Sequence, residues 1–142
     1  ARKVVIEALE ATANILEAVP NTRIALCHAG SPHDRLSQGL SSWAKNLRYL
    51  SSLPQVVCKL SGFGMFDHSW TIKSITPFIE TCIDQFGPER CMFGSNFPVD
   101  SLYSDYATLV AAHCQIVPKA YHQAVFYETA KTFYSLQTLE KV

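Results

Sequence analysis

The sequence predicts an α/β fold in which parallel strands alternate with helices. Three apolar runs carry this prediction, because each is too short for a buried helix and suits a strand covered on both faces. They lie at about 22–28, 55–60 and 90–94, and each ends in polar residues beside a glycine. Stretches with helical spacing separate them, which implies right-handed βαβ units. Such strands form either a small open sheet or about three-eighths of a (β/α)8 barrel.

The first part of the chain is expected to hold two helices around the first strand. Residues 3–18 place apolar side chains at helical spacing. The strand at about 22–28 follows and leads into a loop rich in turn residues. The next helix is expected at about 36–51, and Leu53-Pro54 ends it.

The rest of the chain continues the alternation. The expected elements are a strand at about 55–60, a loop at 61–68, a helix at about 77–86, a strand at 90–94, a loop at 95–101, a helix at about 102–114 and a helical region from Pro118 to about Leu136. Pro77 is expected at the first helical position after Thr76 as the N-cap, and Gly87-Pro88 ends that helix. The last region is expected to break near Tyr127.

Composition is that of one folded domain. The chain has 142 residues, 48% of them apolar, and its twelve basic residues balance twelve acidic ones. We therefore expect no nucleic-acid partner and no membrane partner, since no apolar stretch approaches the roughly 18 residues of a membrane span. The chain begins with Ala and has no signal-peptide pattern, so we expect residues 1–142 to be a single partial domain of something longer.

The cysteines are expected to be buried free thiols. There are five, an odd number, without CxxC spacing, and three fall within expected strands: Cys27, Cys58 and Cys91. This pattern favours a reducing compartment and a cytoplasmic location. Metal or redox use is the alternative.

Polar residues at the strand ends form the candidate site. In either architecture ligands bind beyond the carboxyl ends of the strands, so these groups would meet at one rim. They are His28, Lys59 or Ser61, and Ser95-Asn96. Without this geometry they are separated by about 30 positions of sequence each.

Each of these residues has a catalytic and a structural interpretation. His28 could serve as general base, electrophile or metal ligand, or could tie down its loop. Lys59 could bind a carboxylate or polarise a carbonyl, or could extend to solvent. Ser61 could bind substrate or complete a tight turn with Gly62. Asn96 could bind or orient substrate but cannot act as a general base.

Asp100 could be that base, or could cap the helix that follows. The other histidines and the acidic loop residues are expected either at the rim or, more commonly, on the surface: His33, Asp34, Asp67 and His68. His113 and His122 fall in expected helices and are expected to be structural. The sequence contains no HxH, HExxH, GxSxG, P-loop or GxGxxG pattern.

Three motifs in order resemble the amidohydrolase-related family. They are Leu26-Cys27-His28-Ala29-Gly30-Ser31-Pro32, Val57-Cys58-Lys59-Leu60-Ser61-Gly62 and Arg90-Cys91-Met92-Phe93-Gly94-Ser95-Asn96-Phe97-Pro98-Val99-Asp100. The chain is most similar to the metal-dependent-hydrolase or lactonase branch, which includes fuconolactonases and 2-pyrone-4,6-dicarboxylate lactonases. The resemblance covers essentially the whole chain. It implies the C-terminal portion of a (β/α)8 TIM barrel, strands six to eight with their helices.

The resemblance also implies roles for the site residues. His28 matches the family's histidine at the end of strand six, and it is the one family-matched candidate for a metal ligand. Asn96 occupies the position at which many members carry a catalytic Asp. Because an amide cannot take a proton from water and binds zinc poorly, this departure draws attention to Asp100. Whether the protein binds one divalent metal such as zinc, or none, stays open, since the family's first-strand HxH is not in this chain.

We therefore expect a hydrolase of small molecules, completed by an N-terminal half that this chain lacks. Water would attack a lactone or related cyclic ester or amide, assisted by Asp100 or by a carboxylate from that half. His28 and Lys59 would bind the carbonyl oxygen or an acidic substituent, and Asn96, Ser61 and Ser95 would contact substrate or water. The alternative is a catalytically degenerate domain that binds or scaffolds without turnover. Association into a homo-oligomer is the remaining expectation for partners.

Overall fold

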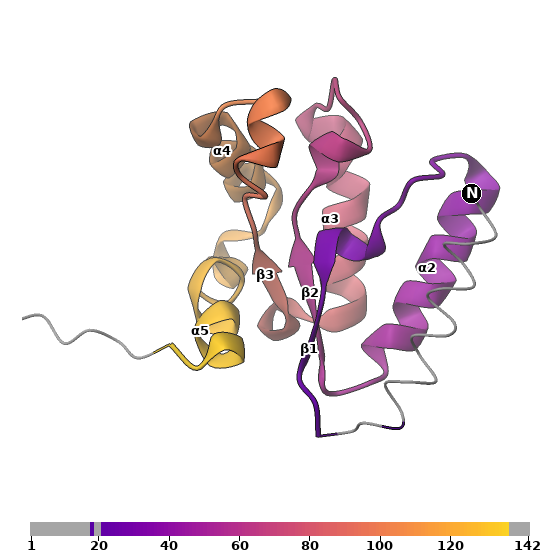
Figure 1. Ribbon diagram of the computed structural model, residues 1–142, viewed down its shortest axis with the longest axis vertical. Helices are drawn as coiled ribbons and strands as arrows, with labels where there is room; N and C mark the ends of the chain where they lie inside the picture. The colour runs from indigo at the N-terminus through magenta and orange to yellow at the C-terminus, as the bar shows by residue number, and fades with distance from the viewer. Residues whose placement is uncertain (1–17, 19–20, 137–142) are drawn as a thin grey trace, which may run out of the picture.

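A three-stranded parallel sheet forms the centre of the molecule (Figure 1). The computed structural model describes residues 18 and 21–136, so the helix expected at 3–18 lies outside the described residues apart from its last position. The strands are β1 (Ile24–Leu26), β2 (Val56–Leu60) and β3 (Cys91–Phe93), in the order β1-β2-β3. Cys58 pairs with Leu26 on one side and with Cys91 on the other. The predicted alternation and the parallel sheet are confirmed.

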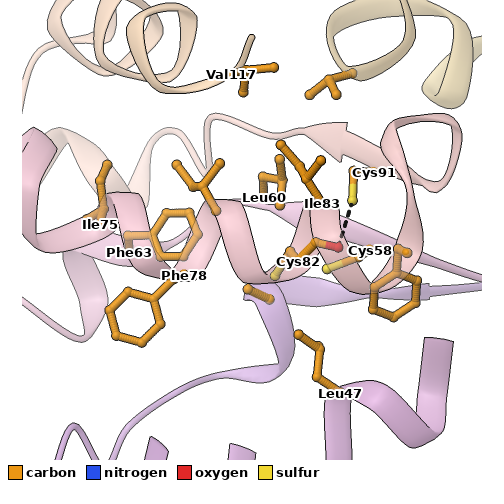
Figure 2. Packing of buried hydrophobic residues seen from close by; sticks show 14 of the residues in the cluster. Leu47, Cys58, Leu60, Phe63, Ile75, Phe78, Cys82, Ile83, Cys91 and Val117 are labelled. Carbon is orange, nitrogen blue, oxygen red and sulfur yellow. Dashed lines mark hydrogen bonds between the residues drawn. The ribbon is translucent and has the colours of Figure 1, made fainter. Parts of the chain in front are cut away.

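Helices cover one face of this sheet. They are α2 (Ser37–Ser51), α3 (Ile72–Phe86), α4 (Tyr106–Ile116) and the short α5 (Thr129–Tyr134). α3 packs against β2 and contacts both α2 and α4 (Figure 1). The apolar core lies between α3 and the strands and contains Leu47, Cys58, Leu60, Phe63, Ile75, Phe78, Cys82, Ile83, Cys91 and Val117, among others (Figure 2).

The helix α3 begins five residues earlier than Pro77, so that prediction was wrong. Thr71 is the N-cap, and it forms a capping box with Ser74, with hydrogen bonds of 3.1 and 3.0 Å. These reciprocal bonds satisfy N–H groups that the first turn leaves without partners. Pro77 lies inside the helix on its exposed side. The apolar side chains on the opposite face, from Ile75 to Phe86, are buried. Their burial stabilises the helix by more than the loss of one backbone hydrogen bond at the proline costs.

The helices near the C-terminus differ in detail from the expectation. α4 begins at Tyr106 rather than near 102, because Asp105 is its N-cap and accepts a 2.8 Å hydrogen bond from the Thr108 N–H. The region beyond Pro118 does not break near Tyr127. Instead it runs from a 3-10 turn (Lys119–Tyr121) through a π-helical turn (Ala124–Glu128) into α5.

The cysteines are free thiols, as predicted, but not all are buried. Cys58, Cys82 and Cys91 lie in the core, where the Cys91 Sγ approaches the Cys82 carbonyl oxygen at 3.5 Å (Figure 2). Cys27 is exposed, because β1 ends at Leu26 and Cys27 begins a 3-10 turn. Among the helices that the structure describes, none combines the length and apolar character needed to cross a bilayer.

Candidate active site

The chain turns sharply beyond β1 and directs His28 toward the neighbouring strand. His28, Ala29, Gly30 and Ser31 all have positive φ, with +54° at His28. Left-handed backbone costs a non-glycine residue roughly 1–2 kcal/mol, and such residues concentrate at functional sites. The Trp43 indole N–H donates a 2.7 Å hydrogen bond to the Ala29 carbonyl and holds this turn on α2.

The end of β2 meets the His28 ring directly. Ser61 is 2% exposed, and its Oγ lies 3.0 Å from His28 Nδ1, within hydrogen-bonding distance. Gly62 follows with a φ of +69° and completes a tight turn into the 3-10 helix Phe63–Met65. His28 and Ser61 are 33 positions apart in sequence, and the parallel sheet brings them together. This agrees with the prediction that polar residues at the carboxyl ends of the strands meet at one rim.

Lys59 lies on the sheet face opposite the core. Side chains alternate along a strand, so Cys58 and Leu60 point into the core and Lys59 does not. Its Cε lies 3.4 Å from the point where a Cβ on Gly94 would be, which places the lysine stem beside the end of β3. Within the described residues the ammonium has neither an ion pair nor a hydrogen bond. It is therefore available to an anionic or carbonyl group.

Asn96 and Asp100 form a pair beyond β3. The Asn96 side chain donates from Nδ2 to Asp100 Oδ1 at 2.9 Å and to Met65 Sδ at 3.1 Å. Asp100 is 1% exposed and lies in a 3-10 turn (Val99–Leu102), with its Oδ2 lacking any hydrogen-bond partner in the described chain. The interpretation of Asp100 as a helix cap is wrong, since Asp105 takes that role.

Electrostatic interactions among Asp100, His28 and Lys59 affect the pKa values of Asp100 and His28. Burial raises the pKa of Asp100 above its ordinary value of 3.8, while the hydrogen bond from Asn96 and the charge of His28 oppose the rise. Burial lowers the pKa of His28 below 6.5, the Lys59 charge adds to this, and Asp100 opposes it. At neutral pH the imidazole is therefore uncharged. His28 thus interacts with a cation and with a carboxylate in the same site.

The remaining candidates serve local structure. The Ser95 Oγ accepts a 3.3 Å hydrogen bond from the Phe97 N–H in its own loop. The loops after β1 and β2 are joined by ion pairing and ring contacts: Arg35 with Asp67 at 2.8 Å, His33 with Phe66, and His68 with Tyr103 from the third loop. His113 and His122 each hydrogen-bond a backbone carbonyl four or five residues earlier, as expected for structural histidines.

Sequence reasoning missed the contact between Asn96 and Met65 and the space that two glycines leave for neighbouring side chains. Cβ atoms at Gly62 and Gly94 would approach His28 and Ser61 at 2.5 and 3.2 Å, respectively. Both glycines follow the strand ends in sequence, and that position was the available signal. As metal donors the site offers the His28 imidazole and the Asp100 carboxylate. Nowhere in residues 18 and 21–136 do three His, Cys, Asp or Glu side chains group as a metal site would require.

Comparison with known proteins identifies relatives of this chain. Residues 4–136 match a family model described as Amidohydrolase. The L-fucono-1,5-lactonase of Burkholderia multivorans is 35% identical over 128 residues, which cover 80% of this chain and 43% of that enzyme. The uncharacterized protein y4mH of Sinorhizobium fredii is 40% identical over 118 residues, covering 81% of this chain and 39% of that protein.

The fold also resembles that of solved amidohydrolase structures. A crystal structure of an amidohydrolase from Burkholderia multivorans with bound zinc superposes with a TM-score of 0.85 at 29% identity, covering 93% of this chain and 50% of that one. The chain therefore spans half or less of the length of these relatives.

Proposed function

The chain belongs to the amidohydrolase family, and from this we propose that the full-length protein containing it opens a lactone or related cyclic ester by attack of water. The proposal is supported by the lactonase name of a relative 35% identical to the chain and by the buried Asp100 carboxylate. Of these, the carboxylate carries the argument, because its Oδ2, which has no partner among the residues that the structure describes, is an acceptor already taken out of bulk water.

Asp100 is assigned as the general base. Its Oδ2 accepts a proton from water, and the resulting hydroxide attacks the ring carbonyl carbon. When the bond between that carbon and the ring oxygen breaks, Asp100 returns the proton to the departing oxygen and a hydroxy acid leaves. The raised pKa of Asp100 makes this carboxylate a stronger base than an exposed one.

The other groups stabilise charge and hold the base. A neutral His28 can donate from Nε2 to the carbonyl oxygen as negative charge develops there. Lys59 supplies a cation for the same oxygen or for an acidic substituent of the substrate. Asn96 fixes Asp100 through its 2.9 Å hydrogen bond, so the amide that replaces the family's usual Asp orients a carboxylate four residues on. This favours turnover over a domain that only binds.

The Burkholderia multivorans amidohydrolase structure contains bound zinc. The site residues of this chain do not by themselves supply enough ligands for a zinc ion. His28 and Asp100 are two donors, and structural or catalytic zinc takes three or four protein ligands. Further ligands would have to come from the rest of a longer protein. No step above depends on a metal.

We also propose that the sheet is the C-terminal part of a closed (β/α)8 barrel. Three parallel strands covered by helices on one face, in a chain that covers half of its structural neighbour, support this. The partner strands would belong to the same longer protein. His28, Lys59 and Asn96 would then lie at the C-terminal mouth of the barrel.

The activity can be tested with a panel of five- and six-membered lactones. We expect the full-length protein to hydrolyse at least one of them, measured as acid release with a pH indicator. A parallel series with a chelator separates a metal-dependent reaction from a metal-independent one. Absence of turnover on every lactone, with the protein folded, would contradict the proposal and favour a binding role.

The isolated chain is expected to associate. Within the described residues both edge strands, β1 and β3, lack a further strand, and unpaired edges promote pairing between chains. Sedimentation of residues 1–142 alone should therefore show dimers or larger species. A monomer that unfolds in one cooperative transition would contradict the expectation of an incomplete barrel.

A further inference from the structure

Gly62 leaves the space that the His28 ring occupies. A Cβ at this position would lie 2.5 Å from Nδ1, 2.9 Å from Cγ and 3.3 Å from Cβ of His28. The ring is rigid and its own Cβ is close, so rotation alone does not relieve such a collision. Gly87 offers a contrast, because among the described residues a Cβ added there would meet Glu89 Oε2, at 3.4 Å, and no atom of His28.

Ser61 determines which ring nitrogen carries the proton. Its hydroxyl is buried and, in the described part of the chain, has His28 Nδ1 as its sole partner. A buried donor without an acceptor costs about 1–3 kcal/mol, more than an unused acceptor lone pair. The hydroxyl therefore donates to Nδ1, and the single proton of the neutral imidazole lies on Nε2.

We infer that Ser61 and Gly62 are positioning residues that hold His28 as the Nε2–H form, with Nδ1 permanently engaged and Nε2 free to donate to the substrate. Ser61 then acts through His28 and not on substrate, unlike the substrate-binding role that the sequence suggested. That Nε2–H donates to a substrate rests on the proposed function. The position of the ring beside Ser61 and Gly62 does not depend on that function.

The protonation state is tested by ¹⁵N spectroscopy of the full-length protein labelled at histidine. At neutral pH we expect the His28 ring, assigned by its loss in His28→Ala, to carry its proton on Nε2 and none on Nδ1. A proton on Nδ1, either alone or together with one on Nε2, would overturn the inference. This readout requires no turnover.

The role of Gly62 is tested by a double-mutant cycle on thermal unfolding. Gly62→Ala should lower the unfolding midpoint when His28 is present, because the added Cβ collides with the imidazole ring. In a His28→Ala background the ring is gone, and Gly62→Ala should then lower the midpoint less. Gly87→Ala is the control, because its added Cβ meets no atom of His28, and its effect should be the same in both backgrounds. An effect of Gly62→Ala that does not depend on His28 would overturn the inference, whether or not a lactone is hydrolysed.

Kinetics separate positioning from substrate contact. Ser61→Ala should lower kcat by about 10- to 100-fold, the range found when a supporting hydrogen bond is removed, with KM changed less than about twofold. A raised KM at unchanged kcat would instead assign Ser61 to the substrate. If no lactone is turned over while the spectroscopic and unfolding results hold, the proposed function fails and the positioning of His28 stands.

Discussion

Replacing Asp100 with asparagine is expected to remove hydrolysis while the fold survives. Because burial raises the pKa of Asp100, the ionised carboxylate is disfavoured in the folded state at every pH above the ordinary value of 3.8. A neutral amide avoids this cost at pH 7 and still accepts from Asn96, although its Nδ2 is then a buried donor at the position of Oδ2, which has no partner in the described residues. We expect kcat/KM to fall about 10²- to 10⁴-fold, and these two opposing terms to leave the protein folded at pH 7.

The measurement pairs initial rates on a lactone with urea unfolding at pH 7. Asp105→Asn is the matched control, because Asp105 is an exposed N-cap and asparagine caps helices equally well. That variant should keep full activity. A folded Asp100→Asn protein that retains activity within tenfold of wild type would contradict the assignment of Asp100.

His28→Ala is expected to lower kcat/KM by two or more decades while the fold survives. Loss of one hydrogen-bond donor to a developing oxyanion typically costs 10²- to 10³-fold in rate. Alanine should be accommodated, since the adjacent Ala29 already adopts a φ of +51°. Steady-state rates report the loss, and circular dichroism reports the fold.

His33→Ala is the control for this variant. His33 is an exposed histidine in the same loop, and its ring contacts Phe66 rather than the strand ends. Its activity should stay near that of wild type. A His28→Ala protein with a near-normal rate would remove His28 from the mechanism.

The strands could be predicted because their signal is local. Short buried apolar runs such as Val56–Leu60 leave few alternatives, and parallel order follows from the intervening helices. Helix ends were less predictable. Pro77 suggested a helix start, whereas the capping box of Thr71 and Ser74 decided it, and the spacing of those two residues was visible in the sequence.

The site was predictable only in part. The prediction that polar residues at the carboxyl ends of parallel strands meet at one rim was correct for His28 and Lys59, because it depends on topology alone. The hydrogen bond between Ser61 and His28 joins residues 33 positions apart, and the left-handed run at His28 is held by Trp43, 14 positions from Ala29. Such contacts, like the burial of Asp100, are set by the folded chain and not by the residues nearby in sequence. The glycines beside the strand ends were the part of this arrangement that the sequence indicated.

The most direct test of the mechanism is the pH dependence of kcat/KM for the full-length protein on its best lactone. The reaction requires Asp100 ionised and His28 neutral. Because the pKa of Asp100 is raised above 3.8 and that of His28 is lowered below 6.5, both conditions are lost as the pH falls and neither is lost as it rises. We predict an acid limb with its midpoint above 3.8 and no loss of rate from there up to pH 8. A rate that falls as the pH increases through this range, or that is independent of pH down to 3.8, would contradict a carboxylate base beside a neutral histidine.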